Sequence, residues 1–168
     1  MAKLSGEIKE LINIIPESDF TKLLVKAASE YKSFHDYLLL TYFDKESVEK
    51  DLYKEAVNDI HHLFFKRYKG FSFQLQVANC TAACSKRIKE FTKLCKNKKL
   101  EADLLVYTLN QVCSDPNCFQ TCFTACDYRV GLLVDRLIKI VNNELHEDHQ
   151  IEYRENINNY RIIMKGNY

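Results

Sequence analysis

The sequence predicts an all-α protein, and three observations support that fold class. Four Gly and two Pro in 168 residues leave little material for hairpins, which favours long helices joined by short connections. Apolar residues recur at steps of three and four along most of the chain, the spacing of one helix face. The apolar run LLVYTL could form a strand, but no second strand is predicted to pair with it, so a buried helix is favoured there. We expect a single helical domain over residues 1–168, with about seven or eight antiparallel helices in a bundle or a short α-α superhelix.

Four helices are expected in the first half of the chain. Pro16 ends the first of them, because the residue before a proline avoids helical geometry. Ser33 is the expected N-cap of the third helix, whose many aromatic residues indicate burial. Asp44 is the expected cap of the fourth, and Gly70 follows it where a left-handed C-terminal residue belongs. The expected ranges are 5–14, 18–31, 33–43 and 44–68.

Four more helices are expected in the second half, and one of them is long enough to organise the others. Asp115 and Pro116 fit an N-cap and a first helical position. Apolar residues keep a helical stripe from Phe119 to Leu145. At ~1.5 Å per residue this helix would be about 45 Å long and would serve as a packing spine. The expected ranges are 72–96, 100–113, 114–145 and 149–164.

The charge balance and the cysteine count restrict the classes of function. With 24 basic and 23 acidic side chains the net charge is +1, which argues against a protein built around nucleic-acid binding. The first residues lack the apolar core and cleavage site of a signal peptide, and no run approaches the ~18 apolar residues of a membrane span. Seven cysteines in such a chain indicate free thiols in a reducing compartment. We therefore expect a cytoplasmic protein without membrane contact.

Three stretches carry a resemblance to a known family. They are the aromatic FHDYLLLTYF, the basic FKRYKG and the apolar EADLLVYTL, and a lysine-rich amphipathic helix precedes them. In their order and residue composition they resemble an uncharacterised family of small bacterial proteins that is defined by a domain of unknown function. The resemblance covers about residues 3 to 162 and implies an all-helical fold and a bacterial, cytoplasmic origin. It implies no active site.

The cysteines are the strongest candidates for chemistry. Cys80 and Cys84 are four residues apart, as are Cys122 and Cys126, so each pair lies on one helix face. If the two helices pack antiparallel, the four thiols converge into a soft-metal site for Cu(I) or Zn(II). The stretches CTAAC and CFQTCFTAC are similar to the C-x-x-x-C pattern of four-helix-bundle copper-storage proteins, which repeat it on several helices where this chain has it on two.

Two other interpretations of the cysteines compete with a metal site. The favoured one is core packing, because cysteine behaves as a small apolar residue. The other is redox sensing by an exposed thiol, for which Cys118 and Cys113 are the candidates.

Other sites have weaker support. Asp59 with His62, and His146 with His149, have the spacing of two ligands on a helix, but a polar surface face or a hydrogen-bonded core histidine is favoured. The chain has no Gly-x-Ser-x-Gly elbow and no phosphate-binding glycine loop. We expect no catalytic residue and no resident cofactor, and we favour a non-enzymatic scaffold that binds a protein or peptide. A Cu(I) or Zn(II) thiolate protein is the alternative, and the oligomeric state stays open.

Overall fold

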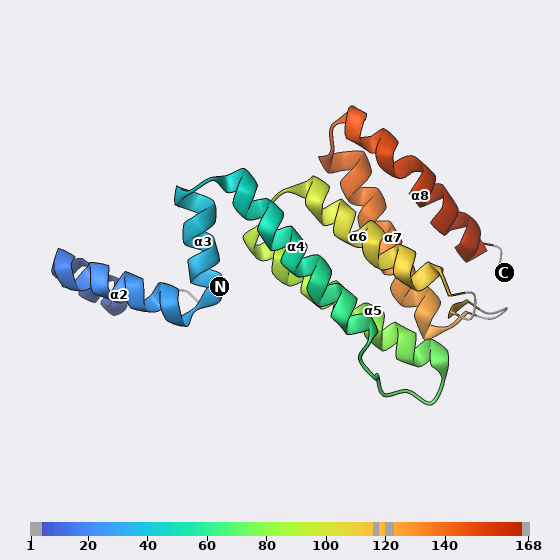
Figure 1. Cartoon of the computed structure of the whole chain (residues 1–168), viewed down its shortest axis with the longest axis horizontal. Coiled ribbons are helices and arrows are strands. Elements are labelled where there is room, and N and C mark those ends of the chain that lie inside the picture. The colour runs from blue at the N-terminus through green and yellow to red at the C-terminus, as the bar shows by residue number, and fades with distance from the viewer. Residues whose placement is uncertain (1–4, 116–117, 120–122, 166–168) are drawn as a thin grey trace. The chain divides into compact units, whose positions relative to one another are not determined.

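The protein is helical throughout the residues that the structure describes. The computed structural model describes residues 5–115, 118–119 and 123–165, and within them it contains helices and no strand (Figure 1). The predicted all-α fold class is therefore confirmed. The helices are α1 (Gly6–Ile14), α2 (Glu17–Glu30), α3 (Lys32–Tyr42), α4 (Lys45–Phe64), α5 (Phe73–Leu94), α6 (Lys98–Cys113), α7 (Ala125–Glu144) and α8 (Glu147–Lys165).

The contacts within the chain divide it into two compact units. We call Met1–Val48 the N-terminal unit and Glu49–Tyr168 the C-terminal unit. The division falls in the first turn of α4, so most of that helix belongs to the C-terminal unit. The expectation of a single domain over residues 1–168 stays a prediction, and a truncation described below tests it.

The N-terminal unit has little interior of its own. Ser5 caps α1 by accepting a hydrogen bond from the amide of Ile8 at 3.4 Å. The helix α3 packs on α2. Asp36 is the one buried side chain among residues 5–48, and it binds Lys32 at 3.1 Å. No apolar side chain described in this unit is buried.

Two predictions for α3 are wrong. The expected N-cap, Ser33, lies inside the helix, which begins at Lys32 without a side-chain cap. The expected burial of its aromatic residues also fails, because Tyr37, Tyr42 and Phe43 are 55%, 75% and 69% exposed. These side chains point around the helix in several directions, so packing against α2 cannot cover them all.

The C-terminal unit is an up-and-down bundle. The helices α4, α6 and α8 run in one direction and α5 and α7 in the other, so neighbours in the chain are antiparallel (Figure 1). The helix α6 packs against α5, α7 and α8. Every buried apolar side chain that the structure describes lies between Leu52 and Tyr160. The core of the described chain is therefore the core of this bundle.

The long spine helix is shorter than predicted. The helix α7 begins at Ala125, and Asp115 does not open it. Thr124 and Asp127 form a capping box, in which the Thr124 amide binds the Asp127 carboxylate at 2.8 Å and the Thr124 hydroxyl accepts from the Asp127 amide at 3.4 Å. Pro116, the predicted first helical residue, lies outside the described residues.

The end of α4 also differs from the prediction. The helix ends at Phe64, and Gly70 is not left-handed, since no described residue has a positive φ. Side chains satisfy the carbonyls of the loop instead. The Tyr68 hydroxyl donates to the Leu63 carbonyl at 3.0 Å, and the Gln76 amide donates to the Gly70 carbonyl at 3.0 Å. A left-handed cap is therefore not needed here.

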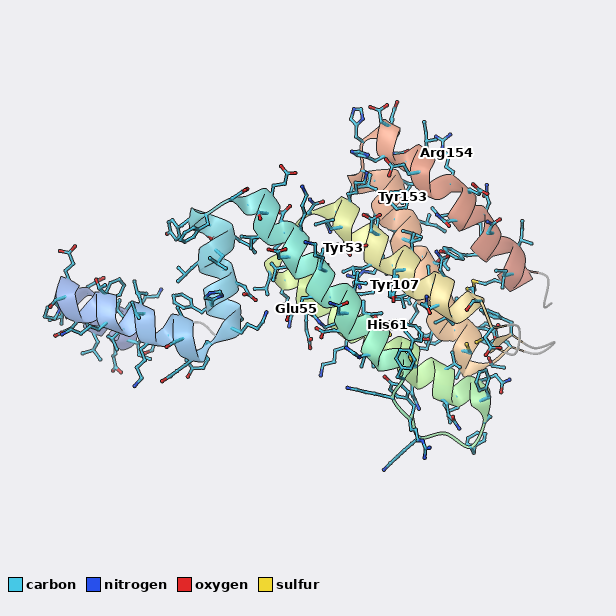
Figure 2. The ribbon with its side chains drawn as sticks, viewed as in Figure 1. Tyr53, Glu55, His61, Tyr107, Tyr153 and Arg154 are labelled. Carbon is cyan, nitrogen blue, oxygen red and sulfur yellow. The ribbon has the colours of Figure 1, made fainter. Side chains whose placement is uncertain are left out.

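Polar contacts join neighbouring helices of the bundle. Figure 2 shows His61 of α4 facing Tyr107 of α6, and the ring nitrogen and hydroxyl oxygen are 3.1 Å apart. Between α6 and α8 the Tyr153 hydroxyl donates to Asp103 at 2.6 Å, and the Tyr160 hydroxyl donates to the Asn110 side chain at 2.6 Å. These contacts fix the lengthwise position of α8 along α6.

Candidate functional site

Five cysteines gather at one end of the bundle. The helices α5 and α7 pack side by side in parallel, so the first turns of both lie at the same end, where α6 finishes (Figure 1). None of the described cysteines forms a disulfide. The five are Cys80, Cys84, Cys113, Cys118 and Cys126.

The first thiol pair lies on α5. Cys80 and Cys84 are one helical turn apart on α5, close enough for the two thiols to affect each other's ionisation. Cys80 also lies 3.7 Å from the Leu63 carbonyl and within hydrogen-bond reach of the Tyr68 hydroxyl. The interaction with the Cys84 side chain lowers the pKa of Cys80 against the opposing effect of burial, and the same interaction followed by burial raises the pKa of Cys84. Cys80 is therefore the first of the two to ionise.

The second thiol pair joins the loop before α7 to the start of that helix. The interaction with the Cys126 side chain, followed by burial, raises the pKa of Cys118. Cys118 also lies close enough to Cys80 for charges on the two sulfurs to interact. Cys113, at the end of α6, is near Cys118, and burial raises its pKa to about 12. The two pairs and Cys113 are thus neighbours around Cys118.

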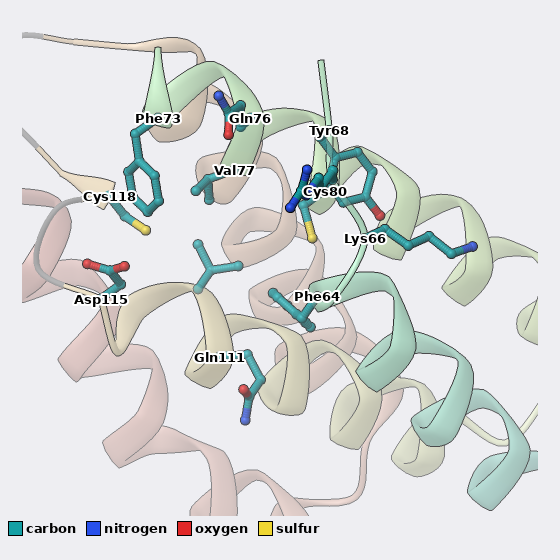
Figure 3. Close-up of a pocket in the computed structure, with 12 residues that line it drawn as sticks. Phe64, Lys66, Tyr68, Phe73, Gln76, Val77, Cys80, Gln111, Asp115 and Cys118 are labelled. Atoms are coloured by element: carbon teal, nitrogen blue, oxygen red, sulfur yellow. The ribbon is translucent and has the colours of Figure 1, made fainter. Parts of the chain in front are cut away.

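A pocket of about 610 Å³ gives access to the cluster. Figure 3 shows Cys80 beside Tyr68 on one side of the pocket and Cys118 beside Asp115 and Phe73 on the other. Lys66 and Arg67, from the loop after α4, also line it. One sulfur of each thiol pair therefore faces a space that a small ligand or ion can enter.

The predicted metal ligands are brought together only in part. Cys80 and Cys84 are neighbours on α5, and Cys126 is linked to them through Cys118, although α5 and α7 are parallel and not antiparallel as the prediction assumed. The fourth predicted ligand, Cys122, lies outside the described residues. Within the described ranges, no group of three or more His, Cys, Asp or Glu side chains is placed to hold a metal ion.

Sequence reasoning missed the role of one cysteine. Cys118 was expected to be exposed, because it falls off the stripe of an assumed helix from 114 to 145. It is only 2% exposed and pairs with Cys126, because α7 starts later and residue 118 lies in a short turn before it. The short spacing of Cys113, Cys118 and Cys126 in the sequence is the feature that could have indicated that these cysteines lie close together.

The histidine pairs do not form a site. Asp59 binds the Nε atom of Arg87 at 2.6 Å, so its carboxylate serves an ion pair between α4 and α5. His146 and His149 pair separately with Asp148 and Glu152, each at 3.2 Å, on an exposed surface. The polar-face interpretation fits these contacts.

The described residues include no helix that is long and apolar enough to cross a membrane. No protein-family model, curated protein or solved structure matches the chain. Membership in the family of small bacterial helical proteins that the sequence resembles therefore stays a prediction.

Proposed function

We propose that the protein binds Cu(I) through the thiol pairs at the cysteine end of the bundle. The observation that carries this proposal is the pairing of Cys80 with Cys84 and of Cys118 with Cys126 around one pocket. Sulfur ligands select soft ions, and two thiolates suffice for Cu(I), whereas a structural zinc site needs four ligands in a tetrahedron. The described residues offer pairs of thiols and no set of four ligands around one point, which favours copper over zinc.

The protonation of the thiols sets the pH dependence of binding. A metal ion binds the thiolate, so each bound Cu(I) displaces the protons of its ligands. Cys84, Cys113 and Cys118 all have raised pKa values, so they compete with the metal for protons near neutral pH. The apparent Cu(I) affinity should therefore rise with pH. Cys80, with its lowered pKa, is the expected first ligand.

Competition with a coloured Cu(I) chelator under anaerobic conditions tests the proposal. The reduced wild-type protein should remove Cu(I) from the chelator and should be stabilised against heat by the bound ion. A double variant, Cys80→Ala with Cys118→Ala, removes one sulfur from each pair and should abolish this competition. Zn(II) should raise the melting temperature less than Cu(I) does.

The chain offers a matched control for the double variant. Cys95 is also buried, at 1% exposure, but it lies at the far end of α5. Fifteen residues separate it from Cys80, or about 22 Å along the helix. Cys95→Ala should leave Cu(I) uptake unchanged. Equal uptake by Cys95→Ala and by the double variant, or no competition by the wild type, would show that the cysteines only fill the core.

A second candidate is a non-enzymatic interaction domain that joins two copies of the chain. The observation that favours it is the N-terminal unit, where α1 and α2 are amphipathic and every apolar side chain described is at least partly exposed. Apolar faces of this kind mark protein contacts, and helix pairs from two copies can enclose a shared core. The large exposed apolar residues there include Ile8, Leu11, Ile14, Phe20, Leu23 and Val25.

Sedimentation over a wide range of protein concentration tests the interaction candidate. The full chain should associate as its concentration rises. Leu11→Glu with Leu23→Glu should keep it monomeric, because a charge would be buried in the shared core. Ile151→Glu, at an exposed position on α8, is the control and should not change association. A wild-type chain that stays monomeric throughout contradicts this candidate.

A further inference from the structure

A second concave site lies between α5 and α7, separate from the cysteine pocket. It is a groove of about 390 Å³, and none of its lining residues also lines the cysteine pocket. Four of the side chains that line it are cationic, and no carboxylate does. The four are Lys86 and Lys89 from α5 and Arg129 and Arg136 from α7.

Three of these cations have no ion-pair partner among the described residues. Lys86, Lys89 and Arg129 are exposed and form no salt bridge there. Arg87, the neighbour of Lys86 in the sequence, is held by Asp59 at 2.6 Å. Three uncompensated positive charges around one small groove create a local field that attracts anions.

The fourth cation is fixed in place. Buried Glu101 accepts from Nε of Arg136 at 2.9 Å and from its Nη2 at 2.7 Å. The remaining guanidinium nitrogen, Nη1, is buried and has no hydrogen-bond partner among the residues that the structure describes. Both N–H donors of Nη1 are therefore unused by the described residues. Ser85 adds a hydroxyl to the same wall.

We infer that this groove binds a small molecule with at least two phosphate groups, of the size of a nucleoside diphosphate or triphosphate. A phosphate group matches the donors, since it carries up to two charges and three acceptor oxygens and pairs well with arginine. Arg129 and Arg136 are seven residues apart, or about two turns of α7, so both lie on the same face of the helix and their long side chains can reach one ligand. A groove of 390 Å³ is within the range of small-ligand sites.

The size of the groove and the charge of the chain favour a small ligand over a nucleic acid. An extended polyanion needs a basic surface along its length, and the protein has a net charge of only +1. Within the groove itself, the three cations without an ion-pair partner among the described residues offset most of the charge of one di- or triphosphate.

Calorimetric titration of the full-length protein with ATP and with tripolyphosphate tests the inference. Both should bind, and the affinity should fall as salt is added. Lys86→Glu with Arg129→Glu should weaken binding by more than about tenfold, because two attractive charges become repulsive. The matched control is Lys93→Glu with Lys139→Glu, which makes the same charge change at exposed positions of the same two helices outside the groove. It should retain the wild-type affinity.

Three results would overturn the inference. One is no binding of either probe, and another is an equal loss in the groove variant and its control, which would mean diffuse attraction by surface charge. The third is an oligonucleotide that binds more tightly than ATP and gains affinity with length, which would assign the groove to nucleic acid. Circular dichroism of each variant checks that the helices are intact.

Discussion

Glu101 is the buried charge on which the junction of α6 and α7 depends. It is 4% exposed and holds Arg136 at 2.7 Å and Lys98 at 3.1 Å. We predict that Glu101→Gln lowers the free energy of unfolding by about 3 kcal/mol, because the guanidinium keeps its charge in a buried place without a counter-charge. Urea unfolding followed by circular dichroism measures this difference.

The control lies in the same network. Lys98 also pairs with Glu144 at 3.0 Å, but both side chains of that pair are partly exposed to solvent. Glu144→Gln should therefore cost less than about 1 kcal/mol. If Glu101→Gln costs no more than Glu144→Gln, then Glu101 is not the anchor of this junction.

Single residues were predictable where a local pattern decides their place. The stripe on α5 places Cys80 and Cys84 inside, and both are buried. The ion pair of Glu101 with Arg136 could not be predicted in the same way, since it joins residues 35 positions apart. Such contacts depend on which helices become neighbours, and an amphipathic pattern does not state that.

Among the elements, helix existence was easier to predict than helix limits. Asp44 acts as the N-cap of α4 as predicted, and Ser72, where the predicted helix starts, is the N-cap of α5. The start of α7 was wrong because the sequence offers two cap signals, Asp115 with Pro116 and Thr124 with Asp127, and the second is the one that caps α7. Both signals are compatible with local propensity, so only the packing of the bundle selects between them.

The contact between α6 and α8 should weaken in alkali. Burial, and for Tyr153 the hydrogen bond to Asp103, raises the pKa of Tyr153 and Tyr160 above the ordinary tyrosine value of 10.0. The unfolded chain loses these protons first, so their contribution is complete well below pH 10 and is lost as the pH rises towards the folded values. We predict that the melting temperature falls steadily between about pH 9 and pH 11.

Ionisation of the buried thiols also lowers the stability of the protein as the pH rises. Phenylalanine variants separate the contribution of the tyrosines from that of the thiols. Tyr160→Phe should have a shallower fall in melting temperature with pH than the wild type, because one raised pKa has been removed. Tyr128 is 55% exposed, so Tyr128→Phe should leave the slope unchanged. Identical slopes for Tyr160→Phe and the wild type would mean that Tyr160 ionises equally easily in both states.

In the whole molecule, the buried apolar side chains that the structure describes all belong to the bundle of α4 to α8 or to the loops within it. The sequence predicted antiparallel helices in a bundle, and α4 to α8 follow that pattern. The cysteines were predicted to come together between antiparallel helices, but the two helices that carry them, α5 and α7, are parallel. Hydrophobic periodicity fixes which face of a helix is buried, but not which helix covers it, so this arrangement needed the structure.

A truncated chain that starts at Asp44 tests whether the bundle is a domain by itself. It keeps the cap of α4, the buried Glu49 with its 2.9 Å contact to Asn97, and every buried apolar side chain that the structure describes. Because hydrophobic burial is the main stabilising term, we predict cooperative thermal unfolding with a melting temperature within about 5 °C of that of the full chain. Differential scanning calorimetry of both chains measures this. A truncated chain that unfolds without cooperativity, or far below the full chain, would show that residues 1–43 belong to the same folding unit and that the single-domain prediction is right.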